Sequence, residues 1–150
     1  MIVPEVFVHE LRVRYGECDP QGIVFNANYL LYFDVAFTEL WRAAVGPWQE
    51  TVEGGVDAVV AEATLRFRAP ARFDDELELR AQVISLGRTA ITTDIDVVRG
   101  QELLVHGSLR HVCVATHPDP TEKGLPEDVR KVPLPTPFRD GLSRFLADAP

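Results

Sequence analysis

The sequence predicts an α+β fold in which one long central helix is wrapped by a curved antiparallel sheet of about five strands. Residues 28–45 have helical periodicity and are apolar in nearly every direction, so other structure must cover this helix. Strand-like alternation precedes the helix once and follows it four times, with short glycine-containing connections between the last three strands. A sheet curved about the helix is the simplest way to bury both patterns together.

The chain is expected to form a single domain over 1–150, with its core within about 6–116. Its 150 residues, 46% hydrophobic and 25% charged, are typical of one globular unit. The formal net charge of −8 argues against a nucleic-acid surface, which needs a basic stripe. No apolar run reaches the roughly 20 residues of a membrane span, and the N-terminal residues lack a signal-peptide pattern. Cys18 and Cys113 have no metal-type spacing, so we expect no metal and a reduced, cytoplasmic setting.

The first strand is predicted over 6–15, where apolar and polar residues alternate. Residues 19–22, Asp-Pro-Gln-Gly, have the chemistry of a turn, because proline presets φ and glycine tolerates a positive φ. Either Asn26 or Asn28 is suited to cap the helix that follows. The helix is expected to end at Gly46-Pro47.

The remaining strands alternate well and are joined by short turns, which predicts an antiparallel meander. They span 57–68, 75–86, 89–99 and 102–116. The composition then becomes rich in proline, which predicts a surface tail over 117–150 with a short helix at 138–147. Because a single wrapped sheet leaves edge strands, pairing with a second copy of the chain is expected.

Asp19 stands directly before the turn that leads into the helix, and two explanations apply to it. An aspartate commonly starts a turn by bonding its own backbone, and an acid near a helix N-terminus gains about 0.3–1 kcal/mol. Alternatively, the unpaired N–H groups at Asn26–Asn28 bind a developing oxyanion while Asp19 attacks a carbonyl or activates a water molecule. That second arrangement suits acyl transfer.

Two segments carry a resemblance to a known family. "RVRYGECDPQGIVFNANYLLYFD", residues 12–34, has a basic first residue, a cysteine before the acid, the run Gly-Ile-Val and a tyrosine in the first helical turn. "RFRAPARFDDELELRAQVISLGRTAITTDIDV", residues 66–97, adds a proline, paired aspartates and Gly-Arg-Thr. Together they strongly resemble hot-dog-fold thioesterases of the 4-hydroxybenzoyl-CoA thioesterase and acyl-CoA thioester hydrolase branch. The resemblance covers residues from about 9 to 116.

The resemblance implies a catalytic pair. Asp19 matches the family's carboxylate, which acts as nucleophile or as general base for water. The backbone N–H of Asn26, at the start of the helix, matches the oxyanion donor. Many acyl-CoA relatives have histidine at this position, but the main-chain donor does not depend on the side chain.

The resemblance also implies substrate contacts. Gly22, Val24 and Tyr29 match the family pattern and are expected to bind the substrate, and Arg88 and Thr89 match positions that contact the phosphorylated end of coenzyme A. An arginine and a hydroxyl suit phosphate on physical grounds as well.

The implied function is hydrolysis of an aliphatic or aromatic acyl-CoA to free acid and CoA, with no cofactor beyond the CoA of the substrate. The implied assembly is a homodimer or homotetramer with each acyl pocket shared between subunits. The alternatives are a substrate carried on an acyl-carrier protein, a non-catalytic protein that binds acyl thioesters, and a hydratase or dehydratase of the same fold. The last would need a histidine or aspartate pair, and residues 17–29 contain no histidine.

Other candidate residues have ordinary explanations. Glu17 is expected to be solvated or paired with an arginine rather than to act as a second catalytic acid. Asp34 and Glu39 lie on the polar side of the helix and are fallback acids, since a separate thioesterase branch uses an acid there. His111 alternates with valines, so we expect it in the sheet or core. Cys18 is expected to pack rather than react.

Overall fold

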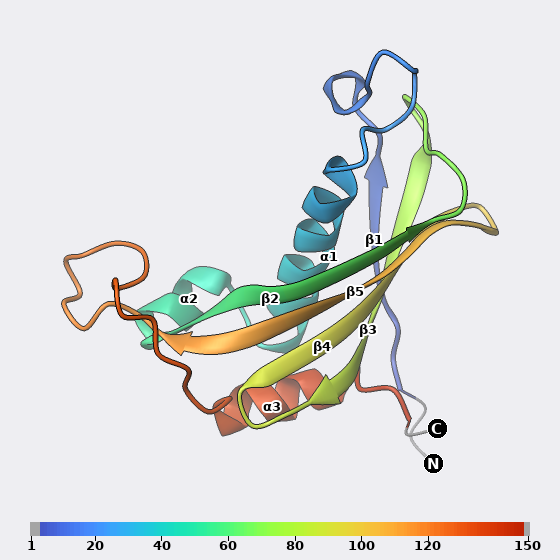
Figure 1. The fold of residues 1–150 in the computed structure, drawn as a ribbon. Coiled ribbons are helices and arrows are strands. Elements are labelled where there is room, and N and C mark those ends of the chain that lie inside the picture. The colour runs from blue at the N-terminus through green and yellow to red at the C-terminus, as the bar shows by residue number, and fades with distance from the viewer. Residues whose placement is uncertain (1–3, 149–150) are drawn as a thin grey trace.

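The computed structural model describes residues 4–148, and its fold is the predicted one: a curved five-stranded antiparallel sheet around one long helix (Figure 1). The elements are β1 (Phe7–Arg12), the 3-10 turn η1 (Tyr15–Glu17), α1 (Asn28–Ala44), α2 (Trp48–Glu53), β2 (Val56–Phe67), β3 (Glu76–Leu86), β4 (Ala90–Arg99), β5 (Glu102–Ala115) and α3 (Thr136–Ser143). The first strand is shorter than predicted, because it ends at Arg12 and the chain then turns through η1.

The strand order is β1-β3-β4-β5-β2, and every neighbouring pair is antiparallel. Strands β3, β4 and β5 form the predicted meander. The expectation that β2 also belongs to that meander is wrong, because β2 pairs with β5 at the far edge of the sheet. Strand β1 occupies the free side of β3, with Phe7 opposite Ala81. The connection between β2 and β3 therefore crosses from one edge of the sheet to the strand next to the opposite edge.

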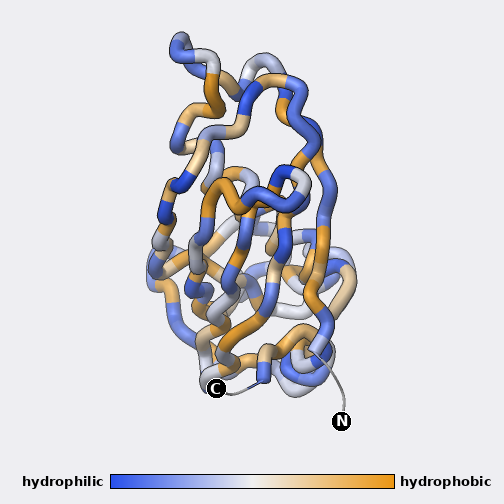
Figure 2. Tube along the Cα trace, turned by 90° about the vertical axis from the view of Figure 1, so that its right-hand side faces the viewer, coloured by the Kyte–Doolittle hydropathy of each residue, from blue (hydrophilic) through white to orange (hydrophobic). Residues whose placement is uncertain are grey.

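The core lies between the concave face of the sheet and one side of α1. Figure 2 shows hydrophobic and hydrophilic residues alternating along the strands, as expected for a sheet buried on one face. The buried residues of the helix are Tyr29, Tyr32, Phe33, Ala36, Phe37, Leu40 and Trp41. Leu30 and Leu31 on the other side remain 43% and 50% exposed, so one chain covers only part of this apolar helix.

Gly107 marks a close approach of β5 to α1. A Cβ atom at this position would overlap the ring of Phe33 and the carbonyl oxygen of Thr64 on the neighbouring strand. The absence of a side chain therefore lets the aromatic ring of the helix rest directly on the sheet.

The C-terminal region contributes more to the core than predicted. Leu134, Leu142 and Phe145 are at most 5% exposed, and Ala147 pairs through its N–H with the carbonyl of Val83. The expectation that the core ends near residue 116 and that a surface tail follows is therefore wrong for this part of the chain. The helix there, α3, begins two residues before the predicted start and ends four before the predicted end. Apolar residues spaced between prolines gave no periodicity that would indicate burial.

His111 lies in the core, as one of its two expected placements. It is 4% exposed and stacks on Phe37, with ring centroids 3.7 Å apart. Its Nδ1 has no hydrogen-bond partner among the described residues. Burial lowers the pKa of His111 from 6.5 to about 4, because the imidazolium would lose its hydration.

This buried histidine predicts a loss of stability in mild acid. Because the folded-state pKa lies below the unfolded-state value, the unfolded chain binds the proton more readily, and stability falls as the pH drops from 6.5 towards about 4. Between about pH 7.5 and 4.5, the wild type should lose about 2.5 kcal/mol more unfolding free energy than His111→Phe. Urea unfolding of the wild type and of His111→Phe at the two pH values measures this difference. Equal losses in wild type and His111→Phe would contradict the prediction.

Candidate active site

Asp19 lies in the loop between η1 and α1, held by a tight turn. Its N–H donates to the carbonyl of Ile23 at 2.9 Å, and its own carbonyl accepts from Gly22 N–H at 2.9 Å. Gly22 has φ +77°, a conformation that other residues rarely adopt. One carboxylate oxygen, Oδ1, accepts from Gln21 N–H at 2.8 Å, and within the described chain the other oxygen accepts no hydrogen bond. The turn therefore fixes the carboxylate and leaves one oxygen free.

The start of α1 supplies unbonded N–H groups beside that carboxylate. Neither predicted asparagine caps the helix: Ala27 is the cap residue and no side chain caps it. Asn28 instead donates its side-chain amide back to the carbonyl of Glu17 at 2.8 Å. Within residues 4–148, the backbone N–H groups of Asn26 and Ala27 donate to no protein acceptor. These two donors are the ones available to an external oxygen atom.

Asp19 and Asn26 line one pocket of about 320 Å³ together with mainly apolar side chains. Its lining residues are Asp19, Gln21, Ile23, Val24, Asn26, Tyr29, Phe67, Arg68, Ala69 and Pro70. The structure thus brings together four of the seven predicted site residues, and Gly22 shapes the adjoining turn without lining the pocket.

Tyr29 is a fixed wall of this pocket. It is 3% exposed and meets Phe67 edge to face, with ring centroids 5.6 Å apart. Its hydroxyl accepts from Ala71 N–H at 3.1 Å, so that oxygen already has a partner. Burial raises the pKa of Tyr29, and the hydroxyl stays neutral. Phe67, which is 54% exposed, is a wall that the sequence reasoning missed, although it lies within a predicted strand and is the last residue of β2.

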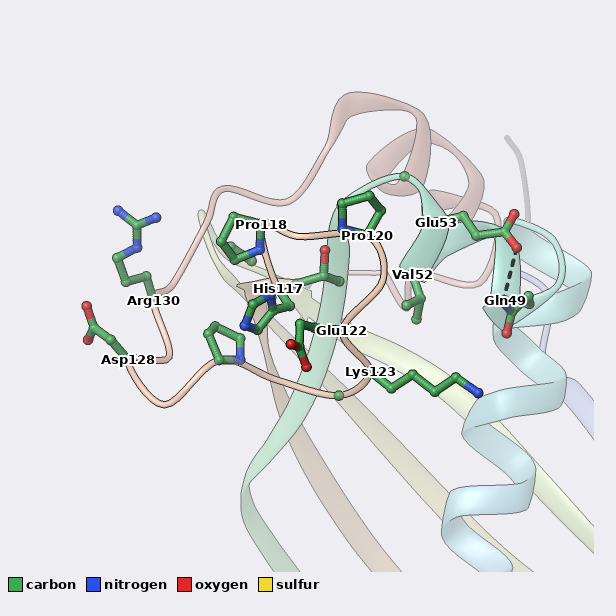
Figure 3. Close-up of a pocket in the computed structure, with 16 residues that line it drawn as sticks. Gln49, Val52, Glu53, His117, Pro118, Pro120, Glu122, Lys123, Asp128 and Arg130 are labelled. Atoms are coloured by element: carbon green, nitrogen blue, oxygen red, sulfur yellow. Dashed lines mark hydrogen bonds between the residues drawn. The ribbon is translucent and has the colours of Figure 1, made fainter.

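A larger cavity, about 1120 Å³, opens between the end of α2 and the proline-rich segment 117–130 (Figure 3). It contains none of the predicted site residues. Its charged groups are of mixed sign, and some are already engaged: Glu53 accepts from Gln49, and His117 accepts from Asp119 N–H. This cavity is larger, but its lining includes neither Asp19 nor the start of α1, where the unbonded N–H donors lie. The smaller Asp19 pocket is therefore the candidate active site.

Arg88 and Thr89 are not near Asp19 within one chain. They lie in the turn between β3 and β4, at the opposite end of the sheet from the Asp19 loop (Figure 1). Their carbonyl groups tie this turn down by accepting from Leu134 and Cys113 N–H, each at 2.8 Å. The Arg88 side chain is exposed and makes no ion pair with any described residue. Any contact between this turn and the Asp19 pocket requires a second copy of the chain.

Glu17 is paired with an arginine, as expected, but it is also buried, with 8% exposure. Its burial alone would raise the pKa of Glu17, but hydrogen bonds from Arg14 and Tyr32 hold that pKa below its usual value. Glu17 does not line the Asp19 pocket, and neither do Asp34 and Glu39 on α1. These three acids are therefore not placed to attack a group bound beside Asp19.

The other reactive groups in the described part of the chain do not form a competing site. His106 meets Asp96 on the outer face of the sheet, Nδ1 to Oδ1 at 2.6 Å, an arrangement that the scattered histidines of the sequence did not suggest. Between residues 4 and 148, no group of three or more acidic, histidine or cysteine side chains could hold a metal ion. Cys18 and Cys113 are both free thiols. No helix in the described chain is long and apolar enough to cross a membrane.

A long helix wrapped by a curved five-stranded antiparallel sheet defines a protein of the hot-dog class. The chain belongs to the thioesterase superfamily, whose family model matches residues 21–106. That match includes Asn26, Arg88 and Thr89 and begins two residues after Asp19. The predicted enzyme class, a thioester hydrolase, is confirmed at the level of the family.

Known relatives agree with this assignment. The acyl-CoA thioester hydrolase YbgC of Escherichia coli O6:H1 is 30% identical over 110 residues, covering 73% of this chain and 82% of the relative. The 4-hydroxybenzoyl-CoA thioesterase of Pseudomonas sp. is 29% identical over 109 residues, covering 63% and 77%. Among solved structures, the hypothetical protein TT1821 of Thermus thermophilus is similar at TM-score 0.80, with 30% identity over 92% of this chain and 98% of that one.

A mutant 4-hydroxybenzoyl CoA thioesterase complexed with 4-hydroxybenzoyl CoA is also similar, at TM-score 0.79, covering 91% of this chain and 98% of that one. At 21% identity, this similarity bears on the fold alone.

Proposed function

We propose that the protein hydrolyses acyl-CoA thioesters to a free acid and CoA, with Asp19 as the carboxylate catalyst and the N–H of Asn26 as the oxyanion donor. The observation that carries this proposal is that the half-buried carboxylate of Asp19 lines the same mainly apolar pocket as Asn26, whose N–H at the start of the helix is unbonded within residues 4–148. The family assignment and the names of the relatives YbgC and 4-hydroxybenzoyl-CoA thioesterase support it.

Two routes fit this geometry. In the first, the free oxygen of Asp19 attacks the thioester carbonyl, the thiolate leaves, and water hydrolyses the resulting anhydride. In the second, Asp19 takes a proton from water as the water oxygen attacks the carbonyl. In both, the negative charge that develops on the carbonyl oxygen is stabilised by N–H donors and by the positive end of the α1 dipole.

The pocket is proposed to be completed by a second copy of the chain. Strand β2 is a 12-residue edge strand, and Val60 and Phe67 on it are more than half exposed. If the β2 edge strands of two copies paired antiparallel, the two sheets would point in opposite directions along their strands. The partner's β3–β4 turn would then lie at the same end as Asp19, where Arg88 and Thr89 are proposed to bind the CoA phosphates. We place this homodimer or homotetramer in the cytoplasm, where both thiols stay reduced.

The function is tested by measuring thiol release from short, long and aromatic acyl-CoAs and from an acylated carrier protein. Release from at least one acyl-CoA is expected. Binding without release would favour a non-catalytic acyl-thioester protein, and release from the carrier protein alone would favour that substrate.

The phosphate contact predicts a selective effect on substrate binding. Arg88→Ala should raise the KM for an acyl-CoA about tenfold and leave kcat unchanged, because a charge-assisted hydrogen bond contributes about 1.5–3 kcal/mol. The same acyl group on N-acetylcysteamine, which has no phosphate, should show no change. Arg130→Ala, which removes an exposed arginine elsewhere, is the control. A KM that rises equally for both substrates would exclude a phosphate contact.

A further inference from the structure

Glu17 is the buried carboxylate closest in sequence to Asp19, and every group that hydrogen-bonds to its side chain is a donor. Its Oε1 accepts from Arg14 N–H at 2.8 Å and from the Tyr32 hydroxyl at 3.0 Å. Its Oε2 accepts from Arg14 Nη2 at 2.9 Å and Nε at 3.2 Å. Both oxygens are therefore fully engaged inside the protein, and neither faces the Asp19 pocket.

Only a side chain that accepts hydrogen bonds at both of its polar atoms satisfies the donors around Glu17. A carboxylate has no donor of its own, so it can accept from the backbone, the guanidinium and the phenol together. Glutamine would place an NH2 group against at least one of these donors and leave it unsatisfied in a buried position. The ionised form is held there, since these hydrogen bonds keep the pKa of Glu17 below its usual value despite burial.

The backbone of Glu17 joins the two halves of the candidate active site. Its carbonyl accepts from Phe25 N–H at 3.0 Å and from Asn28 Nδ2 at 2.8 Å. Phe25 directly precedes Asn26, whose N–H is the proposed oxyanion donor, and Asp19 follows Glu17 by two residues. The position of Glu17 therefore sets the separation between the Asp19 carboxylate and the Asn26 N–H.

We propose that Glu17 is a positioning residue, which acts through Asp19 and the Asn26 amide without touching the substrate. This inference rests on the proposed function and deepens it. The side chain of Glu17 locks the 3-10 turn onto α1 through Tyr32, and its carbonyl locks the helix start onto the same turn. The acid and the oxyanion donor thus share one rigid support.

The kinetic test compares Glu17→Gln with Glu78→Gln. Glu78 also pairs with an arginine, Arg80 at 2.8 Å, but on the outer part of β3. Glu17→Gln should lower kcat about 100-fold with KM within about twofold, because misplacing a reacting group by about 1 Å costs that much. Glu78→Gln should keep the wild-type kcat. A Glu17→Gln enzyme with wild-type kcat would overturn the inference.

A milder variant covers the case in which Glu17→Gln does not fold. Tyr32→Phe keeps the buried ring and removes only the hydroxyl donor to Glu17. It should lower kcat about tenfold, the equivalent of one lost hydrogen bond. In an Asp19→Asn background, Tyr32→Phe should cause a clearly smaller further loss, because the part of its effect that acts through Asp19 is already gone and only the part that acts through the Asn26 amide remains. A full additional tenfold loss in that background would overturn the inference.

Amide hydrogen exchange separates local positioning from general destabilisation. In Glu17→Gln, exchange at Phe25 N–H should accelerate while exchange at Val105 in β5 stays at the wild-type rate. Equal acceleration at both sites would show a merely structural role and overturn the inference.

The exchange measurement also keeps this inference distinct from the proposed function. If the wild type releases no thiol from any acyl-CoA, the proposed function fails, and Phe25 exchange alone decides whether Glu17 anchors the helix start. If the wild type is active and Glu17→Gln keeps its kcat, the function stands and the positioning role fails.

Discussion

Asp19→Asn is expected to lower kcat for acyl-CoA hydrolysis by about 10²–10⁴-fold, the range that a positioned acid–base group contributes. An amide neither attacks the carbonyl effectively nor takes a proton from water. Asparagine still offers an oxygen to Gln21 N–H, so the turn, in which this contact is 2.8 Å long, should persist. KM should change little, because the walls formed by Val24 and Tyr29 are untouched. Steady-state thiol release gives both constants.

Asp140→Asn, at an exposed site on α3, is the matched control and should retain full activity. Wild-type turnover by Asp19→Asn would exclude both catalytic roles of this carboxylate. A single turnover in ¹⁸O-labelled water separates them when the wild type is active. General-base catalysis puts the label into the released acid, whereas attack by Asp19 followed by hydrolysis at its own carbonyl puts the label into Asp19.

Gly107→Ala is expected to destabilise the fold by about 3 kcal/mol, at the upper end of the usual cost of overpacking. The added methyl group would overlap both the Phe33 ring and the carbonyl of Thr64. Relief of either overlap moves α1 away from the sheet or separates β2 from β5. Urea unfolding followed by tryptophan fluorescence measures the change, since Trp41 is buried in α1.

Gly16→Ala is the control for this substitution, because a Cβ at Gly16 meets no atom within 4 Å. It should unfold close to the wild-type midpoint. An unchanged midpoint in Gly107→Ala would mean that the helix and sheet have room for the methyl group, contrary to the observed packing.

The boundaries of α1, β2 and β5 were predictable because they depend on local patterns. The helix predicted over 28–45 is α1, and the strands predicted over 57–68 and 102–116 are β2 and β5, each within one residue at both ends. Period-2 alternation and glycine turns act over a few residues, which is also the range of a sequence pattern. The predicted helix cap was wrong, because the side chain of Asn28 donates to the carbonyl of Glu17. This tertiary contact takes the place of a local capping hydrogen bond.

The candidate site was predictable in part for the same reason. Asp19, Val24, Asn26 and Tyr29 lie within eleven consecutive residues, so a turn and one helical start bring them together. Phe67 reaches the same pocket from β2 and was missed, since nothing local connects it to residues 19–29. Family resemblance assigned Arg88 and Thr89 to the phosphorylated end of coenzyme A, and within one chain their β3–β4 turn lies at the other end of the sheet from the Asp19 loop (Figure 1).

The sequence by itself determined the α+β class, the long apolar helix, the strand-rich second half and the acid before the helix. Those features follow from hydrophobic periodicity and turn chemistry, which are set by neighbouring residues. Only the tertiary structure decided that β2 pairs with β5, that Gly107 seats the Phe33 ring and that Glu17 is buried against Tyr32. These depend on contacts between residues far apart in the chain, whose partners are chosen by packing and hydrogen-bond satisfaction in the folded state.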